Sequence, residues 1–220
     1  MAFVAENVKR LLALILLASC MTPAQAQPAP LLAAAEAGQV EEIVRLLAAG
    51  VAVDARNADG ETALYVAAER GQTAAVRLLL DKGADPKLAT PNGETVLHAA
   101  AMNGGEALMA LLLARGADPN RANRDGERPL FWAALSGKGR AVQLLIEHGA
   151  DINAADGQGN SALHAAADAD FETTAWLLLD QGAKAQLRNA KGETALDIAR
   201  RRGHADLVEL LSRAQQRQGK

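Results

Sequence analysis

Residues 93–101 read Gly-Glu-Thr-Val-Leu-His-Ala-Ala-Ala, and residues 60–68, 33 positions earlier, read Gly-Glu-Thr-Ala-Leu-Tyr-Val-Ala-Ala. The spacing of 33 recurs along the chain at three positions of the pattern. The glycines that open it are Gly60, Gly93, Gly126, Gly159 and Gly192. The leucines that follow them are Leu64, Leu97, Leu130, Leu163 and Leu196, and the glycines that close each period are Gly50, Gly83, Gly116, Gly149 and Gly182. A constant period of this length predicts a solenoid of stacked units.

Each period carries the signals for two short helices and a turn. The N-cap residues predicted for the first helix are Thr62, Thr95, Ser161 and Thr194. The glycines predicted to end it are Gly71, Gly104, Gly137 and Gly203. Asn57-Ala58-Asp59-Gly60 and its equivalents read as tight turns. Helices of about eight residues fall short of the roughly 12–15 that an isolated helix needs, so neighbouring units must share one core.

The segments 60–68 and 93–101 resemble the ankyrin repeat, whose pattern is Gly-x-Thr-Pro-Leu-His-x-Ala-Ala. The resemblance covers roughly residues 31–213. It implies an all-α solenoid of about six helix-turn-helix units with β-turn or hairpin tips. We number the units 1 to 6, beginning near residues 31, 57, 90, 123, 156 and 189. Unit 1 is predicted to be an N-terminal cap, and unit 6, with its charged stretch 196–202, a C-terminal one. Residues 27–30 are expected to be a helix-free linker and residues 214–220 a flexible tail.

Two places depart from the pattern. Asp170 in unit 5 replaces the glycine between the two helices, and Asp tolerates the left-handed backbone region less well than Gly does. Arg128-Pro129 in unit 4 replaces the capping threonine, although Pro129 suits the first position of a helix. We expect units 4 and 5 to be the softest parts of the stack.

The first residues have the order of a secretory signal. Lys9 and Arg10 precede an apolar run over 11–18 that is too short to span a bilayer, and Ala24-Gln25-Ala26 supplies a cleavage pattern. We therefore predict a signal peptide over residues 1–26, in preference to a buried N-terminal helix. Leu17-Ala18-Ser19-Cys20 also resembles a bacterial lipobox, which would end the signal at residue 19 and place a lipid on Cys20. Both routes stay open. Each predicts export, to a periplasmic location in a double-membraned bacterium, either soluble or anchored through Cys20.

Composition argues against several functions. Residues 27–220 hold 25 acidic against 21 basic side chains, and aromatic residues make up 3% of the whole chain, so the basic excess and stacking residues of a nucleic-acid binder are missing. Cys20 is the single cysteine, which rules out a disulfide within the chain. The chain contains no nucleophile elbow, phosphate-binding loop or zinc-protease motif, so we predict neither an enzyme nor a cofactor.

The four histidines were considered as metal ligands. The resemblance assigns His98 and His164 to the pattern's histidine, which hydrogen-bonds neighbouring turns. His148 and His204 lack a histidine three or four residues away that could share a metal. No metal site is predicted.

The resemblance implies that a partner docks on the turn tips and the exposed side of the first helices, which together form a concave surface. Carried over position by position, this surface comprises Asp59, Glu61, Glu69, Arg70, Asn92, Glu94, Met102, Asn103, Arg124, Asp125, Glu127, Leu135, Ser136, Gln158, Asn160 and Asp168.

Some of these positions allow two interpretations. Glu61, Glu94, Glu127 and Glu193 recur at one position, interrupted by Asn160. Such a column would steer a basic partner, or would complement the helix dipoles, and we favour the dipole. We expect Trp132 to pack between units. Trp176 is expected to face solvent, as a cover for its neighbours or as a contact residue.

The sequence therefore predicts a monomeric adaptor in the bacterial cell envelope that binds another protein, whose identity the sequence does not give. The alternative is a metal- or small-ligand-binding envelope protein that uses His148, His204 or the acidic column.

Overall fold

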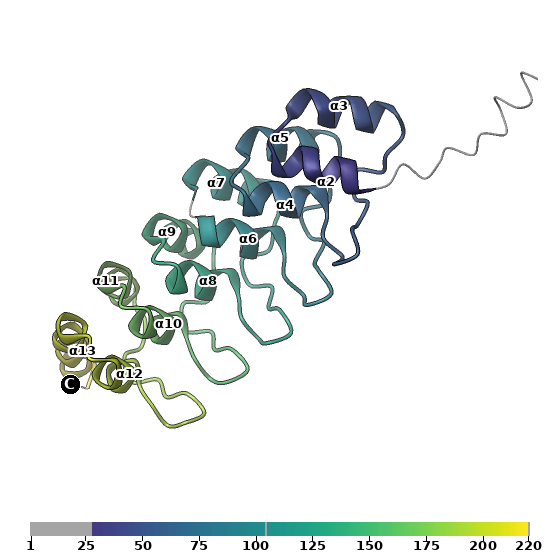
Figure 1. The fold of residues 1–220 in the computed structure, drawn as a ribbon. Coiled ribbons are helices and arrows are strands. Elements are labelled where there is room, and N and C mark those ends of the chain that lie inside the picture. The colour runs from purple at the N-terminus through teal and green to yellow at the C-terminus, as the bar shows by residue number, and fades with distance from the viewer. Residues whose placement is uncertain (1–27, 104, 220) are drawn as a thin grey trace, which may run out of the picture.

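The computed structural model describes residues 28–103 and 105–219, and it folds as a single stack of helix pairs. Figure 1 shows the pairs following one another along a gently curved axis, with the turn tips extending from the same side of every pair. This arrangement confirms the predicted all-α solenoid. The predicted signal segment, including Cys20, lies outside the described residues.

The helices form two layers. The first helices of units 1 to 6 are α2 (Pro28–Glu36), α4 (Ala63–Glu69), α6 (Val96–Asn103), α8 (Pro129–Leu135), α10 (Ala162–Asp168) and α12 (Ala195–Arg202). The second helices are α3 (Val40–Ala48), α5 (Thr73–Asp81), α7 (Glu106–Ala114), α9 (Gly139–Glu147), α11 (Glu172–Asp180) and α13 (Ala205–Gln218). Each first helix packs against the first helices of the units on either side.

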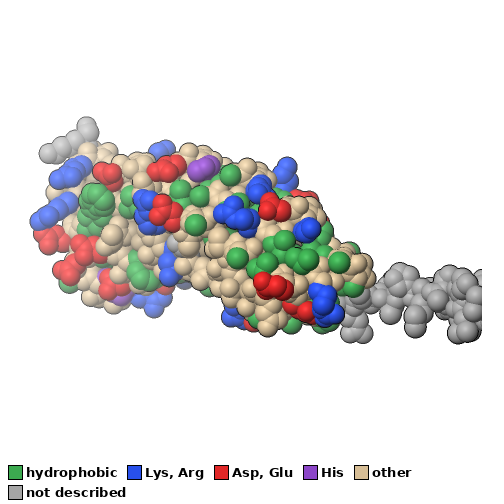
Figure 2. Space-filling view, turned by 90° about the horizontal axis from the view of Figure 1, so that it is seen from above, with side chains coloured by type: hydrophobic (Ala, Val, Ile, Leu, Met, Phe, Trp, Pro, Cys, Tyr) green, Lys and Arg blue, Asp and Glu red, His purple; other side chains and the backbone are tan. Residues whose placement is uncertain are grey.

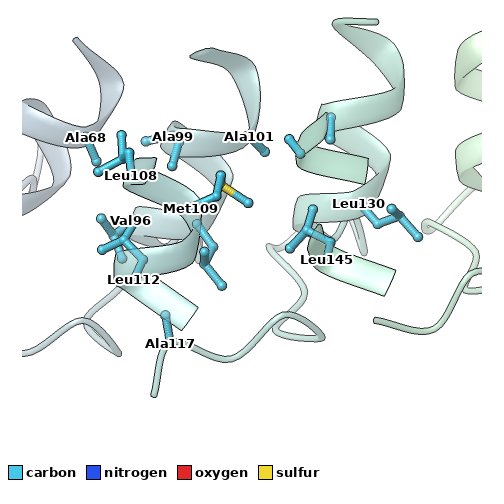
Figure 3. Close-up of a cluster of buried hydrophobic side chains, with 14 of the residues drawn as sticks. Ala68, Val96, Ala99, Ala101, Leu108, Met109, Leu112, Ala117, Leu130 and Leu145 are labelled. Carbon is cyan, nitrogen blue, oxygen red and sulfur yellow. The ribbon is translucent and has the colours of Figure 1, made fainter. Parts of the chain in front are cut away.

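One continuous core runs between the layers. Small residues of two first helices, Ala68 and Ala99, lie beside the larger Leu108 of α7 (Figure 3), and all three are buried. Leu97 and Leu130, at the leucine position of the repeat, are also buried. Because this core is shared between neighbours, helices of seven to nine residues are stable here although they would not be stable alone.

The local signals work as the sequence predicted at most ends of helices. Thr62 Oγ1 accepts a hydrogen bond from Tyr65 N at 3.2 Å at the start of α4, and Thr194 Oγ1 accepts one from Asp197 N at 3.3 Å at the start of α12. Gly71, Gly137 and Gly203 have φ of 70°, 67° and 82°. Short bridges such as Arg56 with Thr62 close the turn tips into hairpins.

Two expectations at the ends of the stack are wrong. Residues 28–30 are not a helix-free linker, because α2 already begins at Pro28. Proline is tolerated in the first turn, where the backbone N–H has no partner within the helix. Nor are residues 214–218 of the predicted tail flexible, since α13 continues to Gln218. The Gln218 side chain donates to Ala183 O at 2.9 Å and accepts from Ala185 N at 2.8 Å, which fixes the last turns of α13 against the end of unit 5.

None of the helices in the described residues combines the length and the apolar character needed to cross a membrane.

Asp170 adopts the left-handed backbone conformation that its place in the repeat predicted. Asp170 has φ of 60° and is the only non-glycine residue with positive φ among the described residues. Its carboxylate lies 3.4 Å from His204 Nδ1, but the side chain is exposed, so the pair contributes little to offset the strain.

We predict that Asp170→Gly stabilises the protein by up to about 1 kcal/mol, because glycine adopts this conformation without strain. For a domain of this size the melting temperature should rise by about 2–4 °C. Thermal unfolding followed by circular dichroism measures the change.

Gly203→Asp is the matched reverse control. Gly203 is the equivalent position in unit 6, and a Cβ added there meets no atom within 4 Å, so only backbone strain changes. This variant should melt at a lower temperature. A lower melting temperature for Asp170→Gly would show that the contact with His204 outweighs the strain.

Candidate functional site

The turn tips are rigid because one side chain organises each of them. In unit 4, Asn123 Oδ1 accepts hydrogen bonds from Asp125 N at 3.0 Å and Glu127 N at 2.9 Å. The same two-bond pattern is made by Asn57, Asp156 and Asn189 in units 2, 5 and 6. These four turns are therefore closed from within, and the exposed residues at their ends are held in place.

Successive tips are also joined to one another. Arg124 N donates to Asn92 O at 2.7 Å, Gly157 N donates to Asp125 O at 2.7 Å and Ala190 N donates to Gln158 O at 2.8 Å. The position that would make this bond between units 2 and 3 is Pro91, which has no N–H. There Arg56 Nη1 instead joins Gly60 O at 2.6 Å to Ala89 O at 2.7 Å.

Two buried histidines connect neighbouring units. His98 Nδ1 accepts from Thr95 N at 3.0 Å, and His98 Nε2 lies 3.2 Å from Glu127 O in the next unit. His164 repeats both bonds, with Ser161 N at 3.1 Å and Glu193 O at 3.2 Å. This pattern assigns a neutral imidazole with the proton on Nε2. The structural role predicted for both histidines is the one they occupy.

Burial disfavours the charged form of these histidines. It lowers the pKa of His98 to about 4, and it also lowers the pKa of His164. In an unfolded chain a histidine takes up its proton near pH 6.5.

The acidic column is largely used within the molecule. Glu127 Oε2 accepts from Trp132 Nε1 at 2.8 Å and from Asn123 Nδ2 at 3.0 Å, and Glu94 Oε2 accepts from the Tyr65 hydroxyl at 3.1 Å. Glu61 accepts from Asn57 Nδ2 at 2.8 Å, and Glu193 pairs with Arg201 at 3.0 Å. Carboxylates already engaged in this way are poorly placed to attract a basic partner.

The predicted surface residues lie in two rows. The tip row carries Asp59, Asn92, Arg124, Asp125 and Gln158, all exposed, beside the half-buried Glu61, Glu94, Glu127 and Asn160. The helix-end row lies at the ends of the first helices and carries Glu69, Arg70, Met102, Asn103, Leu135, Ser136 and Asp168. Met102 and Leu135 occupy equivalent positions of units 3 and 4 and are 51% and 44% exposed. Two large apolar side chains are therefore exposed to solvent at the centre of the helix-end row.

Members of both rows line one hollow in units 4 to 6, which we call the concave groove: Gln158 and Asn160 of the tip row, and Leu135 and Asp168 of the helix-end row. It has a volume of about 530 Å³. The first helices contribute Phe131, Leu135, His164, Ala165, Asp168, Ile198, Arg201 and Arg202, and the tips contribute Gln158, Asn160, Asn189, Ala190, Lys191 and Glu193.

Two charged residues of unit 6 that line this groove, Lys191 and Arg201, are absent from the surface predicted from the sequence. Lys191 continues the position of Asp59, Asn92, Asp125 and Gln158, and Arg201 continues that of Glu69, Met102, Leu135 and Asp168. Extending the same 33-residue spacing by one more period would have found both. The prediction treats unit 6 only as a cap, whereas its charged side chains also line the hollow.

Trp132 packs between units as expected. Its ring lies edge-on to His98 of the preceding unit, with the ring centroids 5.3 Å apart. Trp176 is 54% exposed on α11, also as expected, and lines a second hollow of about 500 Å³ with Leu210, Arg213 and Arg217 of α13.

The side of the molecule opposite the tips is less uniform (Figure 2). Charges of both signs are interspersed over much of it, and hydrophobic side chains gather toward the N-terminal unit. Val44, Leu47 and Val53 line a hollow in that unit, and Val44 is 42% exposed.

Metal-ligating side chains do not converge. Within the described residues, no three His, Cys, Asp or Glu side chains gather as a metal ion would require. His148 Nδ1 lies 2.9 Å from Leu144 O of its own helix, and His204 lies beside Asp170 alone.

We predict that stability falls as the pH is lowered from 7 to 4, because the unfolded state binds protons that folded His98 and His164 reject. The stabilisation that these neutral histidines provide is fully present above pH 6.5. It is lost as the pH falls toward the pKa of the folded state, and for His98 the loss in the free energy of unfolding is up to about 3 kcal/mol. His98→Phe, which places in unit 3 the residue that unit 4 has as Phe131, should be less stable at pH 7 but should lose less on acidification. Urea unfolding at pH 7, 5.5 and 4 measures this.

His148→Phe is the control, because His148 is exposed and should leave the pH dependence nearly unchanged. An unaltered pH dependence in His98→Phe would contradict the assignment of a buried neutral imidazole.

Comparison with known proteins agrees with this architecture. A family model described as ankyrin repeats (3 copies) matches residues 2–90, 82–156 and 154–218. No curated protein matches the chain.

Proposed function

Because the chain belongs to the ankyrin repeat family, whose stacks generally mediate protein–protein interaction, we propose that it is an exported adaptor of the bacterial cell envelope that holds a partner protein on its concave face. The proposed role is binding, with no catalytic step and no cofactor. The protein acts as a monomer in this proposal.

One observation carries the proposal. Met102 and Leu135 lie exposed at equivalent positions of adjacent units, and Leu135 also lines the concave groove. Large apolar side chains next to a hollow are the kind of surface that a partner covers. The tips beside them are held by hydrogen bonds within each turn and between turns, so little order has to be gained on binding.

The site of processing decides how the adaptor is held in the envelope. Helix α2 begins at Pro28, so cleavage after Ala26 would leave the first helix whole. Cleavage before Cys20 would leave eight residues ahead of α2, which span at most about 25–30 Å when extended. A lipid on Cys20 would then keep unit 1 close to the membrane surface, whereas the first route gives a freely diffusing protein.

Mass spectrometry of the protein isolated from its host distinguishes the routes. We expect a mature chain that begins either at Gln27 or at an acylated Cys20. A chain that still begins at Met1 would contradict the proposed export.

The partner-binding face is tested by capture from an envelope extract of the source organism. We predict that Met102→Asp and Leu135→Asp each lose at least tenfold of the captured partner, because a charge in an apolar contact costs more than about 1.4 kcal/mol. Quantitative mass spectrometry of the captured proteins measures the loss. Trp132 is unsuitable for this test, because its contacts with Glu127 and His98 are structural.

Val44→Asp is the matched control, since Val44 is 42% exposed and Leu135 44%, and Val44 lies on a second helix of unit 1. Capture by this variant should equal that by the native chain. Unchanged capture by Met102→Asp and Leu135→Asp would show that the partner binds elsewhere.

A further inference from the structure

The charge of the chain changes sign along the stack. Residues 28–187 carry 21 acidic and 13 basic side chains, a net charge of −8. Residues 188–220 carry four acidic and eight basic side chains, a net charge of +4. A terminal unit must be polar to stay soluble, but that requirement does not select the positive sign.

The helix dipole accounts for only part of this excess. Basic residues complement the C-terminal end of a helix, and α12 ends in Arg200, Arg201 and Arg202. However, α4 and α10 end in Glu69 and Asp168 at the same position of the repeat, and these helices are equally well formed. Lys191, moreover, lies in a turn.

The positive residues of unit 6 are part of the concave groove. Arg202 donates two hydrogen bonds to Asp168, at 2.7 and 2.8 Å, and Arg201 pairs with Glu193 at 3.0 Å. The hydrogen bond from Arg201 and the charge of Lys191 both lower the pKa of Glu193. We call these charged residues the rim of the groove. Its three cations, Lys191, Arg201 and Arg202, outnumber its two carboxylates, Asp168 and Glu193, so the rim has an excess of positive charge.

Between these charges the groove exposes apolar side chains beside the polar Gln158, Asn160 and Asn189. Phe131 and Leu135 of unit 4 and Ile198 of unit 6 contribute its large apolar side chains. Ala165 of unit 5, which is equivalent to Ile198 of unit 6, is the small residue that lines the hollow between them. A volume of about 530 Å³ is enough for one or two apolar side chains of a peptide.

We infer that the partner segment held by this groove is acidic: it places an aliphatic or aromatic side chain over Phe131, Leu135 and Ile198, and carboxylates beside Lys191 and Arg201. This inference rests on the proposed function and adds the chemistry of the partner to it. Charge complementarity at the rim would select the partner and speed its encounter, while the apolar anchor would supply most of the affinity.

The test is a selection from a random 12-residue peptide library displayed on phage, with the complete mature chain as the target. We expect the recovered peptides to be enriched in Asp and Glu next to a Leu, Ile, Phe or Trp. Synthetic copies should bind Lys191→Glu/Arg201→Glu at least tenfold more weakly than the native chain. Raising NaCl from 50 to 500 mM should weaken native binding about threefold to tenfold, because the rim is exposed.

Arg213→Glu/Arg217→Glu is the control. It makes the same change of net charge in the same unit, but on α13, outside the groove. It should change the affinity less than twofold. The single variant Lys191→Glu leaves the Arg201–Glu193 pair in place, so its effect is readable even if the double variant is unstable.

Each other outcome overturns the inference. Recovered peptides that are neutral or basic, or no enrichment at all, would exclude an acidic segment. Equal losses in the test and control variants would show a response to net charge alone. If Leu135→Asp abolishes binding of neutral or basic peptides, the proposed function stands and this inference fails; if peptide binding and partner capture both survive Leu135→Asp, both fail.

Discussion

A helix of seven to nine residues makes too few backbone hydrogen bonds to persist in water, and this shortness is the constraint on which the whole structure depends. Each unit can be stable only while its apolar faces are covered by the units beside it. Small residues at the Ala68 and Ala99 positions let the first helices approach closely, and the larger Leu108 lies beside them. Stability is therefore distributed along the stack as contacts between neighbours, with no central core that would dominate.

The units are joined differently from one interface to the next. Between units 3 and 4 a buried imidazole and a tip-to-tip bond act together, as they do between units 5 and 6. Between units 4 and 5, Phe131 replaces the histidine and cannot donate to the following unit, although Gly157 N still joins Asp125 O. Unit 4 also lacks a side-chain cap on α8, which lines the concave groove.

The fold was predictable because the 33-residue period is a property of residue types in sequence, and so were its local irregularities at Asp170 and Pro129. The ends were not. Whether Pro28 starts a helix, and whether Gln218 is held, depends on neighbours in space that no periodicity describes. The groove could not be predicted in full, because its lining combines side chains of three successive units whose packing the period alone does not describe. The rim residues Lys191 and Arg201 were within reach, but the assignment of unit 6 as a cap hid them.

Capping and the proposed binding are compatible uses of the same charges. A terminal unit has one face without a neighbour and is the first part of a solenoid to open. Here α13 is longer than the other second helices, and Gln215 and Gln218 bind Ala185 and Ala183, so unit 6 is fastened more extensively than a minimal cap would need. This attachment matters for the groove, because unit 6 supplies part of its lining. If unit 6 unfolded for part of the time, the groove would be incomplete for that fraction and its affinity would fall in proportion. A segment lying across units 4 to 6 would in turn hold the last unit in place, so that occupancy of the groove and order at the end of the stack would reinforce each other.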